Sequence, residues 1–261
     1  MRFCSLGSGS GGNATLIEAS QGITQTRLLV DCGFSLRELE RRLERAGCTA
    51  QELDAVFITH EHGDHAGCVL PLAHKHGVPV YTSRGTWRAI AHKAGERFDD
   101  DLLHFVADGE TVALGDIELR PFAVPHDANE PLQLRASDGA RKMALITDIG
   151  SLAPRVVEAL QGQHALLLEC NHEESLLRAS NYPESLKRRI LGTHGHLANH
   201  VSAELLSAIL HTGLRVVAAA HLSERNNRPE LARAALAGVL GCAGHEVPVA
   251  DQALGLPWTG I

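Results

Sequence analysis

The segment from residue 60 to residue 65, with the sequence His-Glu-His-Gly-Asp-His, constrains this chain more than any other stretch. It follows an apolar run, Ala55–Thr59, that predicts a buried strand, and its glycine permits a turn that directs several side chains to one centre. Such a concentration of metal-binding side chains is costly to bury unless something pairs with it. A polar surface loop with incidental histidines is the alternative, but the pattern fixes four residue identities at once. The segment therefore predicts a metal site that includes His60, His62, Asp64 and His65.

The residue types of this segment indicate which cofactor it would bind. Neutral imidazoles and a carboxylate suit zinc, iron or manganese, and two ions rather than one would use the whole group. We therefore expect two divalent metal ions as cofactors, zinc or manganese, with iron as an alternative.

Composition limits the class of protein. The chain has 261 residues, of which 44% are hydrophobic and 21% charged, as in globular proteins and unlike disordered chains. The net charge of −7 argues against a generally basic surface that coats nucleic acid, although it leaves a local basic patch open. No secretory signal and no run of 18 apolar residues occurs, and the six cysteines are scattered without a Cys-x-x-Cys motif. We therefore expect a cytoplasmic protein with reduced thiols and no membrane association.

The pattern of apolar residues predicts short strands interrupted by helices. Gln21-Gly22 is predicted to be a hairpin turn, and Ser35 is predicted to start a helix with Glu38 as its capping-box partner. The predicted strands are Phe3–Leu6, Ala14–Ala19, Arg27–Asp31, Ala55–Thr59, Val78–Tyr81, Thr111–Leu114, Ile117–Ala123, Met143–Thr147, Ala165–Leu168 and Leu214–Ala220. Further helices are predicted at Pro154–Gln161, Pro183–Leu191, Ser202–His211 and Pro229–Val239.

The arrangement of these elements favours one α/β domain that spans residues 1–261. No long linker, repeat or low-complexity tract divides the chain. Helices that can cover both outer faces of the strands favour a β-sandwich flanked by helices, although periodicity alone leaves the topology open.

The segment at residues 60–65 resembles the His-x-His-x-Asp-His motif of the metallo-β-lactamase superfamily, whose fold is a four-layer αββα sandwich. The resemblance implies further ligands downstream, and His126, Asp148 and His221 occur in the family's order at predicted strand ends. It also implies that Asp31 matches an earlier family residue that supports the ligand loop without binding metal. By the resemblance, one ion would bind His60, His62 and His126, the other would bind Asp64, His65 and His221, and Asp148 would bridge them. Asp64 and Asp148 are thereby also candidate catalytic residues.

A dinucleotide-binding fold is an alternative explanation of the N-terminal glycines. Gly7, Gly9 and Gly12 fit the pattern Gly-x-Gly-x-x-Gly, and Asp31 lies near the spacing of the acidic residue in that fold. However, the stretch from Ala14 to Asp31 reads as two strands, which leaves no room for the required helix. The glycine loop more naturally brings its backbone and Asn13 close to a substrate, and a plain turn is the other interpretation.

Three further segments narrow the resemblance to one branch. They are Glu169-Cys170-Asn171-His172, Gly195-His196-Leu197-Ala198-Asn199 and His221-Leu222-Ser223, the last followed by Asn226-Asn227. Together with Ser8–Asn13 they resemble the YycJ (WalJ) group, relatives of the PhnP phosphodiesterases. The resemblance covers nearly the whole chain and implies a 5′-to-3′ exonuclease with DNA as its partner. One departure is Ala198, where the group's motif has serine.

The predicted chemistry is hydrolysis of a phosphodiester bond, because two ions can generate hydroxide near neutral pH while neutralising phosphoryl charge. His196 is the candidate for protonating the leaving oxygen or holding the phosphate, since imidazole titrates near pH 7. A helix-capping or surface histidine is the alternative for His196. Candidate substrate-binding residues are Asn13, Asn171, His172 and Asn199.

Two basic clusters adjoin the predicted site loops. One comprises Lys187, Arg188 and Arg189, and the other comprises Arg225 and Arg228. They could grip a DNA backbone, but short charge runs are also typical of solvated helix faces.

Other classes on the same fold fit the chain less well. A secreted antibiotic-degrading lactamase would need a signal peptide, a glutathione thioesterase would need a longer C-terminal region, and RNA-processing relatives carry a large insertion. The redox di-iron proteins have glutamate where this chain has His62. A non-catalytic metal-binding protein would have lost ligands. A small-molecule or cyclic phosphodiesterase and a thioesterase remain the main alternatives.

Overall fold

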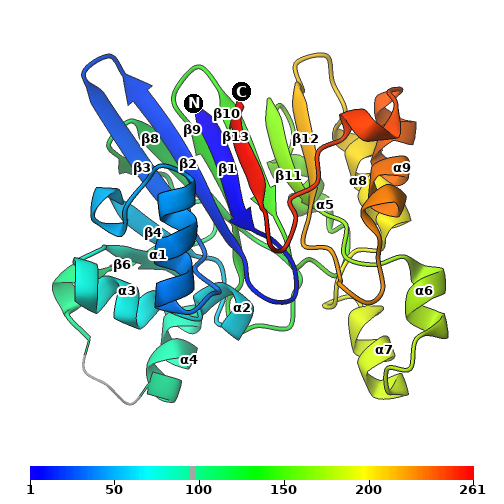
Figure 1. Cartoon of the computed structure of the whole chain (residues 1–261), viewed down its shortest axis with the longest axis horizontal. Coiled ribbons are helices and arrows are strands. Elements are labelled where there is room, and N and C mark those ends of the chain that lie inside the picture. Colours follow the sequence, from blue (N-terminus) through cyan, green and yellow to red (C-terminus); the bar gives the residue numbers. More distant parts are fainter. Residues whose placement is uncertain (95–97) are drawn as a thin grey trace.

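The computed structural model describes residues 1–94 and 98–261 and contains two β-sheets packed face to face (Figure 1). In this described part, the first sheet has the strand order β13-β1-β2-β3-β4-β5-β6 and the second has the order β12-β11-β10-β9-β8-β7. The strands of the first sheet are β1 (Arg2–Gly7), β2 (Ala14–Gln21), β3 (Thr24–Val30), β4 (Ala55–Ile58), β5 (Val80–Thr82), β6 (Leu103–Phe105) and β13 (Leu256–Gly260). Those of the second sheet are β7 (Val112–Leu114), β8 (Ile117–Ala123), β9 (Leu132–Ser137), β10 (Lys142–Ile146), β11 (Ala165–Glu169) and β12 (Val216–Ala220).

Each sheet combines an antiparallel half with a parallel half. β13, β1, β2 and β3 pair antiparallel, whereas β3, β4, β5 and β6 run parallel. In the second sheet β7 to β10 pair antiparallel and β10, β11 and β12 run parallel. Parallel strands end at the same edge of their sheet, so the loops that follow them gather there.

Helices cover the outer face of each sheet, which makes four layers (Figure 1). α1 (Leu36–Arg45), α3 (Val69–His76) and α4 (Arg84–Ala94) cover the first sheet. The second sheet is covered by α5 (Pro154–Ala159), α8 (Asn199–Ile209) and α9 (Pro229–Leu240). Shorter helices are α2 (Gly63–Ala66), α6 (Glu174–Ala179) and α7 (Glu184–Ile190), with 3-10 turns at Ala50–Glu52, Asp100–Leu102 and Gly244–Glu246. The predicted α/β class and αββα sandwich are confirmed.

Alternate residues of the central strands pack into different cores. In β11, Leu167 faces the core between the sheets, whereas Leu166 and Leu168 face the core beneath α5, α8 and α9. In β3, Leu28 faces the inter-sheet core and Leu29 the core beneath α1 and α3. Successive strand side chains point to opposite faces, so a strand covered on both sides must be apolar throughout.

The hairpin and helix signals are confirmed with one correction. Gln21 pairs with Thr24 across the predicted turn. Ser35 caps α1, and its hydroxyl accepts a hydrogen bond from the Glu38 amide at 3.4 Å. The Glu38 carboxylate does not complete the capping box, because it binds Arg41 and Arg42 instead.

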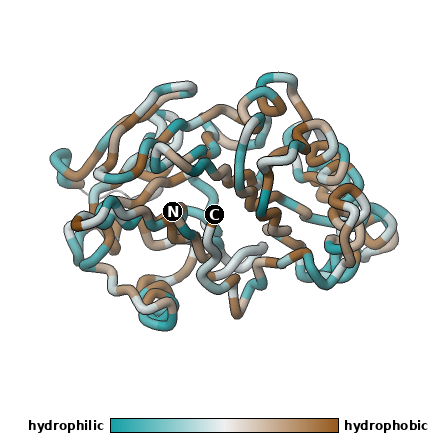
Figure 2. The backbone as a smooth tube through the Cα atoms, turned by 90° about the horizontal axis from the view of Figure 1, so that it is seen from above, coloured by the Kyte–Doolittle hydropathy of each residue, from teal (hydrophilic) through white to brown (hydrophobic). Residues whose placement is uncertain are grey.

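Several elements were not predicted, among them β9, β13, α3 and α4. β13 pairs with β1 at the sheet edge and brings the two chain ends side by side (Figure 2). Among the described residues no helix is both long enough and apolar enough to cross a membrane.

Candidate metal centre and substrate cleft

The predicted metal ligands all follow strands whose carboxyl ends meet at one edge of the sandwich. The segment from His60 to His65 follows β4, and His126 follows β8 in the facing sheet. Asp148 follows β10 and His221 follows β12. The two sheets therefore contribute opposite walls of one site.

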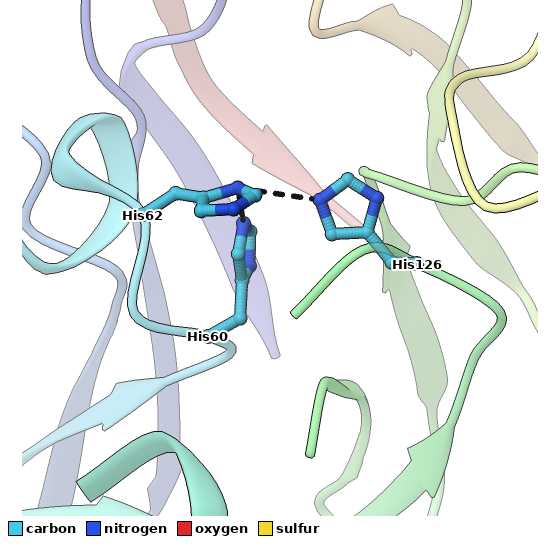
Figure 3. Close-up of side chains that lie close together, drawn as sticks. All are labelled: His60, His62 and His126. Carbon is cyan, nitrogen blue, oxygen red and sulfur yellow. Dashed lines mark hydrogen bonds between the residues drawn. The ribbon is translucent and has the colours of Figure 1, made fainter. Parts of the chain in front are cut away.

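Three imidazoles from both sheets form the first group. His60 Nε2 lies 3.0 Å from His62 Nδ1, and His126 Nε2 lies 3.4 Å from the same atom (Figure 3). The rings of His60 and His62 come from one loop, whereas His126 approaches from the facing sheet (Figure 3). A proton can join two imidazole nitrogens, but a cation can accept lone pairs from all three. This geometry fits a metal ion.

Asp64, His65 and His221 form the second group. Asp64 Oδ2 lies 3.6 Å from His65 Nε2 and 3.7 Å from His221 Nε2. Asp148 lies between the two groups: its Oδ2 is 2.9 Å from His65 Nε2, and its Oδ1 is 3.6 Å from His221 Nε2 and 3.9 Å from His126 Nε2. One carboxylate therefore reaches both groups of ligands.

An orphaned nitrogen provides an independent test of whether these residues fit a metal. His221 Nε2 is buried and has no hydrogen-bond partner among the described residues. Its nearest carboxylate oxygens, on Asp148 and Asp64, lie 3.6 and 3.7 Å away, which is beyond hydrogen-bond distance. A buried nitrogen left without a partner is costly, and a metal ion would satisfy it. The donor set therefore fits divalent metal binding.

The charges of the site differ between the two groups. Burial lowers the pKa of His60 well below its usual value, and burial likewise lowers the pKa of His126. For His221, burial opposes the charged form, but the charge of Asp148 and contacts with Asp64 and Glu169 raise its pKa to about 10. Burial also opposes the charged form of His65, but the charges of Asp148 and Asp31 prevail and raise its pKa. The second group thus carries excess negative charge, which either protons or a cation can balance.

Asp31, which is predicted to support the ligand loop, contacts the proposed ligand His65. Asp31 Oδ2 lies 2.8 Å from His65 Nδ1, and Oδ1 accepts a hydrogen bond from the Thr59 amide at 2.9 Å. A carboxylate at the outer ring nitrogen fixes the tautomer and the orientation of a metal-binding histidine.

Backbone strain is concentrated at the same place. In the described part of the chain, the non-glycine residues with positive φ are Asp31 (61°), Asp148 (51°) and His221 (54°). This conformation is unfavourable for residues with a Cβ, and it persists where the surrounding structure enforces it. Asp31 and His221 directly follow β3 and β12, and Asp148 lies two residues after β10, so the strained positions lie where the chain turns from each strand into the site.

Glu169, the last residue of β11, is a site residue to which the sequence analysis assigned no role. Its Oε1 lies 2.9 Å from His196 Nδ1 and 3.1 Å from His221 Nδ1, and it accepts a hydrogen bond from the Asp148 amide at 3.1 Å. The side chain is fully buried, and although burial favours the neutral form, contacts with His196 and His221 lower its pKa to about 2. The signals in the sequence were a carboxylate at the end of a buried strand and its place in the segment Glu169-Cys170-Asn171-His172.

His196 lies beside this carboxylate at the edge of the cleft. Burial opposes its charged form, but the charge of Glu169 and the hydrogen bond to it prevail and raise the pKa of His196. With Nδ1 directed at Glu169 and 22% of the side chain exposed, Nε2 remains accessible from the cleft. His194, the neighbouring histidine on the other side of Gly195, is exposed.

The four predicted substrate-binding residues occupy different places. Asn171 lines the cleft and donates a hydrogen bond to the His221 carbonyl at 3.1 Å. Asn13 is buried, and its amide group contacts Ser8, Gly9, the Asp64 carbonyl and, at 3.1 Å, Nε2 of the proposed ligand His65. Asn199 forms a reciprocal amide pair with Asn227. His172 is buried, and burial lowers its pKa to about 4. The structure therefore brings one of the four to the cleft wall and places three in the surrounding framework.

A cleft of about 370 Å³ opens over the ligands. Of the basic residues singled out in the sequence, Arg189 lines it and forms an ion pair with Asp127, the neighbour of His126. Arg225 and Arg228 lie outside the lining.

Comparisons with known proteins agree with this architecture. Residues 26–222 match the family model described as "Beta-lactamase superfamily domain". The chain is 36% identical to exodeoxyribonuclease YycJ of Bacillus anthracis, over 95% of this chain and 92% of the relative. It is 34% identical to exodeoxyribonuclease WalJ of Streptococcus pneumoniae serotype 2, over 95% of this chain and 91% of the relative. A diphosphatase of the PhnP family shares the fold, with a TM-score of 0.68, 19% identity and coverage of 100% of this chain and 97% of that one. The chain therefore belongs to the metallo-β-lactamase superfamily, within its YycJ/WalJ group.

Proposed function

We propose that this protein is a metal-dependent phosphodiesterase that acts as a 5′-to-3′ DNA exonuclease. The observation that carries the proposal is the position of Asp148, whose two carboxylate oxygens reach both groups of histidines beside an open cleft. The exodeoxyribonuclease names of relatives aligned over 95% of the chain support DNA as the substrate.

Two divalent ions, zinc or manganese, are the proposed cofactors. His60, His62 and His126 would hold one, Asp64, His65 and His221 would hold the other, and Asp148 would contact both. When bound, such ions lower the pKa of water and neutralise negative charge on a phosphoryl group.

The residues of the chain supply the remaining functions. Asp31 and Glu169 hold His65 and His221 in fixed orientations, so that the second group is preorganised for its ion. His196 is the proposed proton donor to the leaving oxygen. Its Nδ1 is held by Glu169, and the charge of Glu169 and the hydrogen bond to it raise the pKa of the imidazole, which favours the protonated form that a proton donor needs.

A substrate panel tests the proposal. End-labelled single- and double-stranded DNA and RNA would be incubated with the metal-loaded protein, alongside a thioester and a cyclic phosphodiester. The proposal expects stepwise release of nucleotides from the 5′ end of DNA, abolished by Asp148→Ala. Faster turnover of the cyclic diester or the thioester than of DNA would contradict it and identify a small-molecule hydrolase.

A further inference from the structure

Helix α7 has a half-buried apolar face that belongs to none of the three hydrophobic cores. Within the described residues, the helix contains no buried side chain and contributes none to the three hydrophobic cores. It nevertheless carries Leu186 and Ile190, which lie four residues apart and therefore on one face. In Figure 1, α6 and α7 stand apart from the body of the sandwich. An amphipathic helix normally buries its apolar face, so the exposed part of these half-buried side chains is available to contact a ligand.

The apolar face of α7 is directed at the metal cleft. Leu186 and Ile190 both line the cleft, together with Tyr182, which lies four residues before Leu186. The other wall of the cleft is formed by charged and polar groups, among them Asp148 and His221. The cleft therefore has one wall suited to metal-bound phosphate and one aromatic and apolar wall.

The C-terminal end of α7 is fixed relative to the ligands. Arg189 forms an ion pair with Asp127, which directly follows the ligand His126. The His196 amide donates a hydrogen bond to the Ile190 carbonyl at 3.0 Å. These contacts hold the apolar wall at a constant position beside the metal groups.

We propose that Tyr182, Leu186 and Ile190 form a binding site for the nucleobase of the terminal nucleotide, with the Tyr182 ring stacked on the base. This inference rests on the proposed function and extends it by naming the residues that position the end of the chain. A nucleotide is the ligand that combines a phosphate with a flat, uncharged ring, as the two walls require. Stacking on an aromatic ring tolerates every base, which suits an enzyme that degrades DNA of any sequence.

The test compares oligonucleotides that end in a normal or an abasic nucleotide. Tyr182→Ala should raise KM for the normal substrate about tenfold, the effect of losing one stacked base, and should leave kcat little changed. Tyr182→Phe should restore the wild-type KM, because it keeps the ring. Leu186→Ala should weaken binding in the same direction. Ser185→Ala, an exposed position on the same helix, is the matched control. The abasic end should remove the difference between wild type and Tyr182→Ala.

Binding provides a readout that does not depend on turnover. In the Asp148→Asn background, fluorescence anisotropy should show that Tyr182→Ala weakens binding of the normal oligonucleotide and leaves binding of the abasic one unchanged. If the added Tyr182→Ala substitution leaves the affinity for the normal end unchanged, or lowers the affinity for both ends equally, the base-binding site is overturned. A protein that binds DNA through Tyr182 but, with Asp148 intact, cleaves no oligonucleotide would instead refute the exonuclease activity alone.

Discussion

The two groups of ligands differ in what stands behind their imidazole rings. Behind the first group are uncharged oxygens: the Thr59 hydroxyl lies 3.0 Å from His60 Nδ1, and the Gly195 carbonyl lies 3.3 Å from His126 Nδ1. Behind the second group are carboxylates, with Asp31 2.8 Å from His65 Nδ1 and Glu169 3.1 Å from His221 Nδ1. The two groups share Asp148, but the second has additional negative charge next to its histidines.

The partner of the outer ring nitrogen sets the charge of each group. A carboxylate at the outer nitrogen makes the imidazole more basic, so the second group binds both protons and cations more strongly than the first. Metal affinity at the second group should therefore depend more steeply on pH. Asp148 couples the two groups, because its oxygens contact both.

The largest expected effect comes from removing that coupling. Asp148→Ala should lower phosphodiester hydrolysis at least about a thousandfold, because several kcal/mol of metal-dependent stabilisation are lost and each 1.4 kcal/mol is worth about a factor of ten. Circular dichroism should show an unchanged fold. Full activity in this variant would mean that the groups act independently.

His196→Ala should produce the next largest loss. Removing a general acid typically costs about a hundredfold to ten-thousandfold in kcat. Metal content should remain at the wild-type level, since Nδ1 of the ring contacts Glu169 and the ring is not among the ligands proposed for the two ions. Steady-state kinetics and metal analysis check this together, and parallel losses of metal and activity would make His196 a structural residue or a ligand.

Glu169→Gln sharpens the contrast between the groups directly. Loss of the carboxylate behind His221 should lower the affinity of the second group for its ion about tenfold to a hundredfold and leave the affinity of the first group unchanged. Metal titration followed by calorimetry would show one weakened and one unchanged binding event. Glu118→Gln, an exposed position on β8, is the control. An equal loss of affinity in both binding events would show that the charge around the two groups does not differ as described.

The smallest effect expected is on the stability of the metal-free protein. The pKa of His221 in the folded chain is about 10, above the usual value of 6.5, so its contribution to stability is complete below pH 6.5 and disappears as pH rises toward 10. The free energy of unfolding by urea should therefore fall between pH 7 and pH 10. Metal should reverse this trend, because deprotonated imidazoles bind the ions. His221→Asn should flatten the curve of the metal-free protein, and an unchanged slope would argue against the charge difference.

Much of the fold could be predicted because strands that are buried on both faces consist almost entirely of apolar residues. β4, β10 and β11 are apolar throughout except for one charged residue at an end of β10 and of β11, and the ends of each were predicted to within one residue. β13 was missed because Pro257 interrupts its pattern, and proline is tolerated there because β13 is an edge strand paired only with β1 in the described part. α3 and α4 were missed because His and Lys residues obscure their apolar faces.

The candidate ligands could be named from the sequence because the family motif fixes residue types and order. The role of Glu169 could not, since it depends on three residues distant in the chain, Asp148, His196 and His221, that meet only after folding. The contacts of Asn13 and Asn199 could not be predicted either, because their side-chain amides bind residues that are distant in the chain.

Metal analysis combined with anomalous diffraction tests the central claim most directly. We expect two divalent ions per chain, one among His60, His62 and His126, the other among Asp64, His65 and His221, with Asp148 between them. Binding of a single ion at saturation, or anomalous peaks away from these side chains, would contradict it.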